Sequence, residues 1–209
     1  MKRAIYLIVL LVLIVGAANA QYSSNRSIFG MTWDFGLPLD NTKDYIDRTS
    51  FLGFNLNGRT PISPEISVGG MFGWNVFDLV SRDPIEIERP GFGGTISGTQ
   101  ERYLNMFPMM ASGFYNFDTG DIVPYAGLNL GAYYVIQRFA IGTIALEQYT
   151  WHFGVAPEVG ILVSLGGSTY LMASAQYHYA FDSGETIGGK DDNSYSWIGL
   201  NLGLAFTSF

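Results

Sequence analysis

The chain has 209 residues, with 18 acidic side chains against 11 basic ones and a formal net charge of −7. This acidic balance argues against a nucleic-acid-binding protein, which needs basic surface to contact phosphates. The sequence contains no cysteine, which excludes a disulfide framework, a thiolate metal site and a lipid anchor on an N-terminal cysteine. Charged residues are only 14% of the chain, while aromatic residues reach 15% and glycine occurs 26 times. That composition is typical of a β-barrel with aromatic girdles.

The first 20 residues predict a secretory signal peptide. A basic start is followed by an apolar run over residues 4–15 and by a small-residue cleavage site that ends at Ala20. We therefore expect cleavage between Ala20 and Gln21, export through the Sec pathway and one mature domain over residues 21–209. After this segment no uninterrupted apolar stretch of about 20 residues occurs, which disfavours a helical membrane protein.

The mature chain alternates apolar with small or polar residues in short segments. In residues 28–36, for example, Phe29, Met31 and Trp33 fall on one face and Thr32 and Asp34 on the other. This period of two is the signature of strands in a sheet with unlike faces. A secreted soluble β-sandwich is the alternative fold for such a pattern. The predicted strands are 28–36, 51–59, 66–77, 102–117, 122–137, 149–165, 170–181 and 196–206.

The connections between these strands alternate in length. Long ones span residues 38–48, 78–101, 138–148 and 182–195, and short ones span 61–64, 118–121 and 166–169. If both ends of the chain are periplasmic, every long connection is extracellular, which is the outer-membrane topology. Closure into a barrel also removes the unpaired strand edges that hydrocarbon does not tolerate. The sequence therefore predicts an all-β fold, an eight-stranded antiparallel up-and-down transmembrane β-barrel, located in the cell outer membrane.

Three segments carry a resemblance to a known family: PYAGLNLGAYY (124–134), FGVAPEVGILV (153–163) and GLNLGLAF (199–206). With these segments the chain resembles the small porin-like outer-membrane barrels of Gram-negative bacteria, the OmpA/OmpX-like and PorT-like group. The resemblance implies contact with outer-membrane lipid and lipopolysaccharide, and insertion by the barrel assembly machinery. One departure is the end of the chain, since Phe206 continues the lipid-facing series and Phe209 does not. We expect residues 207–209 to form an overhang or a bulge.

The inward-facing positions of the predicted barrel include most of the polar residues of the strands. An eight-stranded barrel has an interior just wide enough for side chains, so we expect a hydrogen-bonded polar plug. Because a buried carboxylate must be paired, we expect Glu158 to be held by Gln176 or His178 on the next strand, or by Arg59. The predicted lumen network comprises Asn55, Asn57, Arg59, Asn75, Asn129, His152, Glu158, Gln176, His178 and Asn201.

Catalysis and metal binding have weaker support in the sequence. His152, His178 and Glu158 lack the spacing of a metal motif, and no serine follows either histidine by two residues, as an acyl hydrolase of this architecture would need. Acidic residues in the long loops could collect Ca²⁺ or bridge lipopolysaccharide through cations, but a solvated loop surface is the better explanation. We predict no catalytic site, metal or cofactor, and a structural or surface-binding role. The alternatives are an accessory component of a secretion or assembly machine, a small-solute channel and a lipid A-modifying enzyme, and any extracellular or secretion-machine partner is unidentified.

Several local expectations follow from the same pattern. Leu128 should face lipid and Asn129 the lumen. Pro108 and Pro157 lie inside strands and should mark bulges or local breaks, since proline donates no ladder hydrogen bond. The facing of strand 102–117 is open, because it is apolar in both registers.

Aromatic residues near strand ends should anchor the barrel at the membrane interfaces: Trp33, Trp74, Trp151, Trp197, Tyr115, Tyr125, Tyr133, Tyr134, Tyr177 and Tyr179.

Overall fold

The computed structural model describes residues 27–82, 85–89, 92–96, 98–118, 120–142, 144–184 and 193–207. The predicted signal peptide, the Ala20–Gln21 cleavage site and Phe209 lie outside the described residues. The barrel strands are β1 (Ile28–Leu39), β2 (Leu52–Pro61), β3 (Ile66–Ser81), β6 (Gln100–Asn116), β7 (Ile122–Ile141), β8 (Ile144–Gly166), β9 (Thr169–Ala180) and β10 (Tyr195–Thr207).

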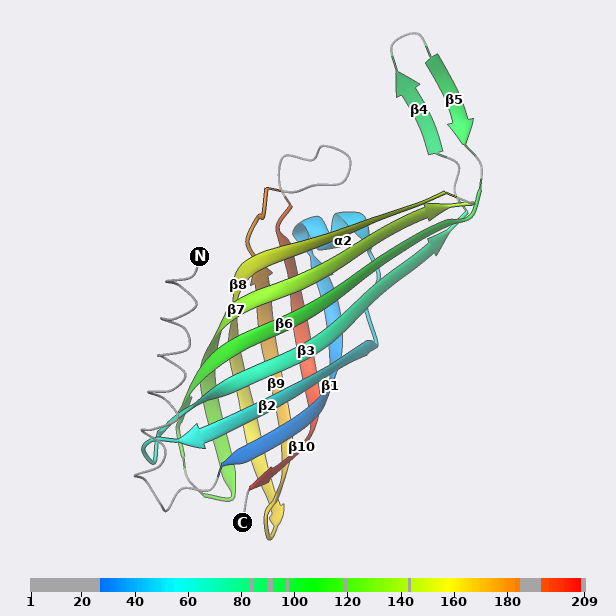
Figure 1. The fold of residues 1–209 in the computed structure, drawn as a ribbon. Helices are drawn as coiled ribbons and strands as arrows, with labels where there is room; N and C mark the ends of the chain where they lie inside the picture. The colour runs from blue at the N-terminus through cyan, green and yellow to red at the C-terminus, as the bar shows by residue number, and fades with distance from the viewer. Residues whose placement is uncertain are drawn as a thin grey trace.

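These eight strands form one closed antiparallel barrel (Figure 1). Each barrel strand pairs with the barrel strands before and after it in the chain, so that β3 pairs with β6. The cylinder closes where β1 pairs with β10, from Ile28 opposite Thr207 to Leu39 opposite Ser196. The predicted eight-stranded up-and-down barrel is confirmed. The described part of the chain contains no helix that is long and apolar enough to span a bilayer.

The predicted facing of the strands is confirmed on seven of them, as β1 illustrates. Phe29, Met31 and Trp33 are 57–62% exposed on the outer wall, whereas Thr32 and Asp34 are at most 2% exposed in the lumen. The fourth predicted strand, left open by the sequence, is β6. Its even-numbered residues point inward, and those over residues 104–114 are buried, among them Leu104, Met106, Met110 and Phe114. One residue departs from the prediction: Val76, expected to face lipid, is buried, and the Ser50 hydroxyl donates to its carbonyl.

Each of the two prolines inside strands interrupts the ladder with one neighbouring strand, and the pairing resumes in the same register. On β6, Pro108 lies where β3 pairing skips from Phe72–Met109 to Asn75–Met106. On β8, Pro157 lies where β9 pairing skips from Val155–Tyr179 to Glu158–Gln176. The predicted local breaks are therefore confirmed, and bulges are absent at both positions.

Two predicted loops are wrong in part, because strands continue beyond the closed barrel. The segment predicted as loop 138–148 is strand up to Ile141 and again from Ile144, joined at a turn where Gly142 has a φ of 57°. Likewise β3 runs on to Ser81, and the rest of loop 78–101 contains a hairpin of β4 (Ile85–Arg89) and β5 (Phe92–Ile96) before β6 begins at Gln100.

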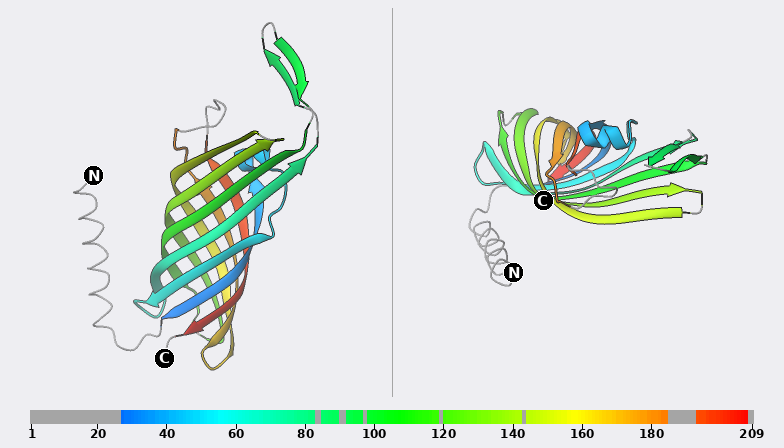
Figure 2. Two further views of the ribbon diagram at one scale, coloured as in Figure 1. Left: turned by 45° about the vertical axis from the view of Figure 1, so that its right-hand side comes forward. Right: turned by 90° about the horizontal axis from the view of Figure 1, so that it is seen from above.

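The long ends of β3, β6, β7 and β8 together form a sheet that projects past the barrel, which we call the arm (Figure 1). The view from above shows the arm leaning away from the barrel mouth, with the β4–β5 hairpin at its end (Figure 2). The polar residues that suggested loops lie on this arm, because a strand outside a bilayer needs no apolar outer face.

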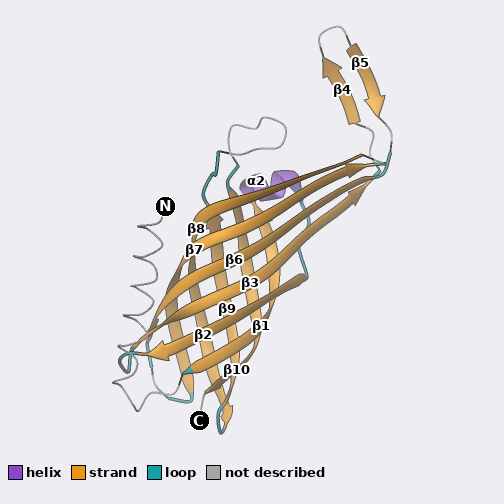
Figure 3. Cartoon of the chain, in the orientation of Figure 1, coloured by secondary structure: helices purple, strands orange, loops and turns teal. Residues whose placement is uncertain are grey.

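The first long connection is also more ordered than predicted. Residues 38 and 39 belong to β1, and a six-residue helix, α2 (Asp40–Tyr45), follows directly. This helix lies at the same end of the barrel as the arm (Figure 3). It is the only helix in the described part of the chain.

Candidate functional site

The lumen contains a network of hydrogen bonds centred on Glu158, which is 3% exposed. The Tyr125 hydroxyl donates to Glu158 Oε1 at 2.8 Å, and Gln176 Nε2 and Asn129 Nδ2 donate to Oε2 at 2.8 and 3.2 Å. The β8–β9 ladder places Gln176 directly opposite Glu158, as the register predicts. Three donors on two oxygens suit an ionised carboxylate, which only accepts hydrogen bonds.

The network continues from Gln176 towards the arm end of the barrel. Because Gln176 Nε2 donates to Glu158, its Oε1 faces His178 Nε2 at 3.0 Å and must accept from it. His178 therefore carries its proton on Nε2, and its Nδ1 accepts from the Tyr133 hydroxyl at 3.0 Å. Asn55 Nδ2 also donates to Gln176 Oε1, at 3.1 Å. The hydrogen bonds from His178 to Gln176 and from Gln176 to Glu158 thus run in one direction, and this chain of donors ends at the Glu158 carboxylate.

Arg59 is buried, with 2% exposure, but it does not join this network. Its guanidinium carbon lies 3.9 Å from the centre of the Phe114 ring and 4.3 Å from that of Tyr125. No guanidinium nitrogen has a hydrogen-bond partner among the described residues. The expectation that Arg59 holds Glu158 directly is therefore wrong: Tyr125 contacts both groups and separates them.

The remaining predicted lumen residues are buried but occupy separate positions. His152 contacts the Thr150 hydroxyl through Nε2 at 2.7 Å and the Phe181 carbonyl through Nδ1 at 2.8 Å. Asn75 donates to Asp34, while Asn201 accepts from Thr32 at 3.2 Å. Asn57 contacts the sulfur of Met172 at 3.5 Å. The described residues contain no cluster of three or more potential metal ligands.

Above His178 the lumen is filled by aromatic rings. Trp197 stacks on the His178 ring, with centroids 4.3 Å apart and planes at 3°, and Tyr133 meets both rings edge-on. Phe77 also packs against Trp197, edge-on. Tyr133 and Trp197 are fully buried and Tyr125 nearly so, which contradicts their predicted role as interfacial anchors. Their positions have the same parity as the lumen residues Asn129 and Asn201, and that signal could have placed them inside.

The helix α2 covers the arm end of the lumen. The Thr42 hydroxyl accepts from the Ser196 backbone N–H at 2.9 Å, and the Ser196 hydroxyl contacts the Asp40 carboxylate at 2.8 Å. Arg102 donates to the Tyr45 carbonyl at 3.0 Å, and Ile46, directly after the helix, is fully buried. Burial raises the pKa of the Tyr45 phenol above its ordinary value. The interior is thus filled by the polar network, the ring stack and the helix.

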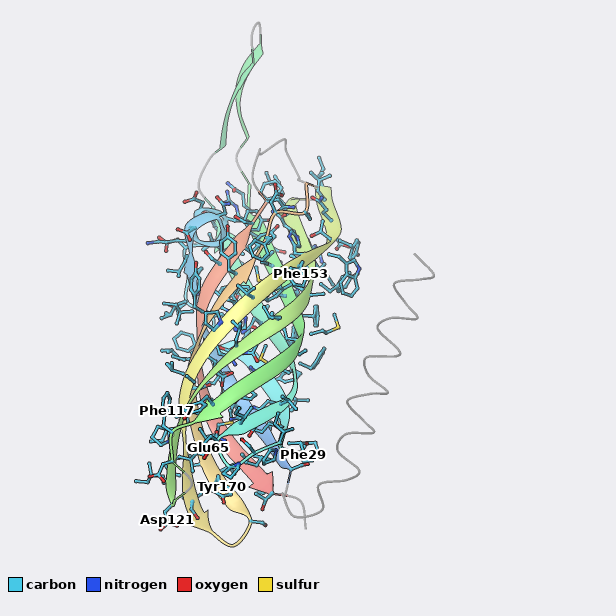
Figure 4. The ribbon with its side chains drawn as sticks, turned by 90° about the vertical axis from the view of Figure 1, so that its left-hand side faces the viewer. Phe29, Glu65, Phe117, Asp121, Phe153 and Tyr170 are labelled. Carbon is cyan, nitrogen blue, oxygen red and sulfur yellow. The ribbon has the colours of Figure 1, made fainter. Side chains whose placement is uncertain are left out.

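The outer wall carries aromatic rings towards both ends of the strands. Phe29 and Phe117 lie towards the end opposite the arm, and Phe153 lies towards the arm (Figure 4). On the arm side, Phe54, Trp74, Phe107, Tyr134 and Trp151 form an unbroken series of ring contacts across five strands, with neighbouring centroids 4.9 to 6.3 Å apart. We call this series the upper girdle. Trp74 and Trp151 are exposed in this girdle, and Trp33 is exposed on β1 opposite Phe54, as predicted for interfacial anchors.

Beyond the upper girdle, one edge of β8 is unpaired among the described residues. Pairing with β9 begins at Gly154, preceded by one hydrogen bond from the Phe181 N–H to the Phe153 carbonyl. Because backbone groups alternate in direction along a strand, the N–H groups of Ala145, Glu147, Tyr149 and Trp151 point to this open edge.

Comparison with known proteins shows the same architecture. No protein-family model and no curated protein sequence matches the chain. Among solved structures, the chain is similar to Ail, the attachment invasion locus protein of Yersinia pestis, in a complex with the heparin analogue sucrose octasulfate. The TM-score is 0.53 at 15% identity, over 87% of this chain and 99% of Ail.

It is also similar to neisserial surface protein A, with a TM-score of 0.51 at 14% identity, over 89% of this chain and 98% of that protein. At these identities the likeness concerns the fold alone. The predicted resemblance to the small outer-membrane barrels is confirmed at that level: the chain has the fold of an outer-membrane β-barrel.

Proposed function

We propose that this chain is a non-enzymatic outer-membrane β-barrel that anchors a binding surface, the arm, outside the cell. The outer wall supports the membrane location, since large apolar side chains such as Leu128, Leu202 and Phe153 are exposed on it. An apolar surface of that extent is costly in water and is stabilised in a bilayer.

The filled interior supports an anchoring role over a channel. The Glu158 network, the Trp197 stack and α2 follow one another along the axis, and each fills the lumen with side chains that contact one another. A protein with such an interior should conduct no steady ion current in a planar bilayer. Steady single-channel current would instead favour a small-solute channel.

The observation that carries the surface-binding role is the open edge of β8 over residues 145–151. Unpaired strand edges bind extended segments of other proteins by adding a strand, and soluble proteins generally protect them. This edge is exposed and includes the apolar side chain of Leu146. A partner that adds a strand here would satisfy the four outward N–H groups. An accessory role in a secretion or assembly machine is the second candidate, favoured by the same edge.

Photocrosslinking in living cells tests this role. A photoreactive residue at Ala145 on the edge should yield a discrete adduct with a partner protein, and the same residue at lipid-facing Leu202 should not. Identifying the adduct separates an extracellular partner from a secretion-machine component. If Ala145 and Leu202 both give no adduct in correctly inserted protein, the surface-binding role is wrong.

A further inference from the structure

A groove of about 340 Å³ lies on the outward face of the arm, over β6, β7 and β8. The ladders arrange its residues in two rows: Asn105, Ile136 and Tyr149 side by side, then Tyr103, Arg138 and Glu147. Glu101 completes the lining. The volume is at the low end of the roughly 300–1,000 Å³ found for ligand clefts.

The groove begins where the upper girdle ends. The Trp74 indole N–H donates to Asn105 Oδ1 at 3.3 Å, and the Tyr149 ring stacks on Tyr134, with centroids 6.5 Å apart and planes at 18°. Both Trp74 and Tyr134 belong to the girdle. Aromatic girdles mark the level of the lipid headgroups. If the barrel lies in the outer membrane as proposed, the groove is therefore beside the headgroups of the outer leaflet.

The side chains of the groove can contact a molecule rich in hydroxyl groups. Tyr103 and Tyr149 offer flat rings with a polar tip, and the carboxylates of Glu101 and Glu147 accept hydrogen bonds. Arg138 adds donors while its Nε lies 3.5 Å from Glu147. The Tyr149 hydroxyl donates to Glu147 at 2.7 Å, and this hydrogen bond raises the pKa of the phenol above its ordinary value, so Tyr149 remains a donor.

The charge of the groove selects against acidic ligands. Two carboxylates face one guanidinium, which already pairs with Glu147, so a phosphate or sulfate group would meet net negative charge. Adjacent hydroxyls on a sugar ring, by contrast, both donate to carboxylates and accept from a guanidinium. The apolar face of the same ring can lie against tyrosine.

From this geometry we propose that the groove binds the uncharged sugar headgroup of a glycolipid in the outer leaflet. The proposal rests on the proposed membrane location, which places the groove above lipid acyl chains. Tyr103 and Tyr149 provide the ring contacts, and Glu101, Glu147 and Arg138 bind the hydroxyls. The arm then has a lipid-sugar site on its outer face and an open strand edge on β8.

Lipid competition in nanodiscs tests the proposal. The full barrel is inserted in nanodiscs that hold equal amounts of a monoglucosyl diacylglycerol, phosphatidylglycerol and phosphatidylcholine, and the retained lipids are identified by native mass spectrometry. We expect the glucosyl lipid to be enriched at least about fivefold over both phospholipids. The double variant Tyr103→Ala/Tyr149→Ala should lose this enrichment. Tyr115→Ala, which removes an outward tyrosine at the other end of the barrel, should retain it.

Each other outcome contradicts the proposal in a distinct way. Equal retention of the three lipids, or preference for either phospholipid, means that the groove does not select a neutral sugar. Enrichment that survives in the double variant places the site elsewhere. Competition by free glucose at concentrations near those of the lipid headgroup would assign the groove to soluble saccharides. Insertion is scored separately by flotation with vesicles: failure to insert contradicts the proposed membrane location, whereas an inserted barrel without enrichment contradicts the sugar site alone.

Discussion

Gln176 Nε2 donates a hydrogen bond of 2.8 Å to Glu158 Oε2 across the β8–β9 ladder, inside the barrel. That contact fixes the orientation of the Gln176 amide, and the amide in turn fixes the tautomer of His178. One carboxylate therefore determines the arrangement of polar side chains over several strands.

Replacing this carboxylate by its amide should destabilise the barrel. In Glu158→Gln, an NH₂ group would face one of the three donors from Tyr125, Asn129 and Gln176. Leaving a buried donor unsatisfied costs about 1–3 kcal/mol. We expect a lower midpoint of urea unfolding in lipid vesicles, with Glu147→Gln on the exposed arm as the control. An unchanged midpoint for Glu158→Gln would contradict the assigned network.

Arg59 should respond differently, because its guanidinium has no hydrogen-bond partner among the described residues. Arg59→Met keeps an unbranched chain between Phe114 and Tyr125 and removes a buried charge, while it loses cation–π contacts that contribute about 0.5–2 kcal/mol. We expect a smaller loss of unfolding free energy than in Glu158→Gln. A larger loss would show that the guanidinium has a strong partner.

The two faces of β7 should tolerate polarity very differently. Leu128 is exposed on the outer wall and Asn129 is buried in the lumen. Leu128→Arg should lower the free energy of unfolding by about 2–4 kcal/mol if the residue is near the midplane, because it puts a charge into hydrocarbon. Asn129→Ser should have a milder effect, since it keeps a polar group in the lumen. The reverse order would mean that the facing assignment is wrong.

The period-two pattern was sufficient to predict all eight strands and the facing of seven, because each wall residue meets either hydrocarbon or a narrow lumen. The pattern did not predict strand at Arg138, Glu147 and Gln148. Both faces of a strand outside the membrane can be polar, so the sequence of such a strand resembles that of a loop. The lumen residues were identified from polarity and parity together. Trp197 was misplaced because residue type alone does not distinguish an interfacial ring from a lumen ring.

The sequence could not predict that Arg59 and Glu158 do not contact each other. Both residues were placed in the lumen correctly, but which of them meet depends on the stagger of strands around the closed barrel. Tyr125 intervenes because it projects inward from β7, next to β8, which carries Glu158. No spacing along one strand encodes such a contact.

The open edge of β8 should be visible in amide hydrogen exchange. N–H groups of Leu146, Gln148 and Thr150 point to β7 and should exchange slowly, whereas those of Glu147, Tyr149 and Trp151 point to the open edge and should exchange fast. Residue-resolved NMR of the barrel in lipid would show this alternation. Uniform protection of residues 145–151 would mean that the edge is already covered by another strand.

The proposed placement of the barrel, with the arm outside the cell, is tested most directly by cysteine labelling in intact cells. The natural chain has no cysteine, so Ala145→Cys on the arm and Asp121→Cys in a turn at the opposite end each provide a single thiol. A membrane-impermeant maleimide should label residue 145 in intact cells and residue 121 only after the outer membrane is permeabilised. Labelling of residue 121 but not residue 145 in intact cells, or of neither residue until permeabilisation, would contradict this placement.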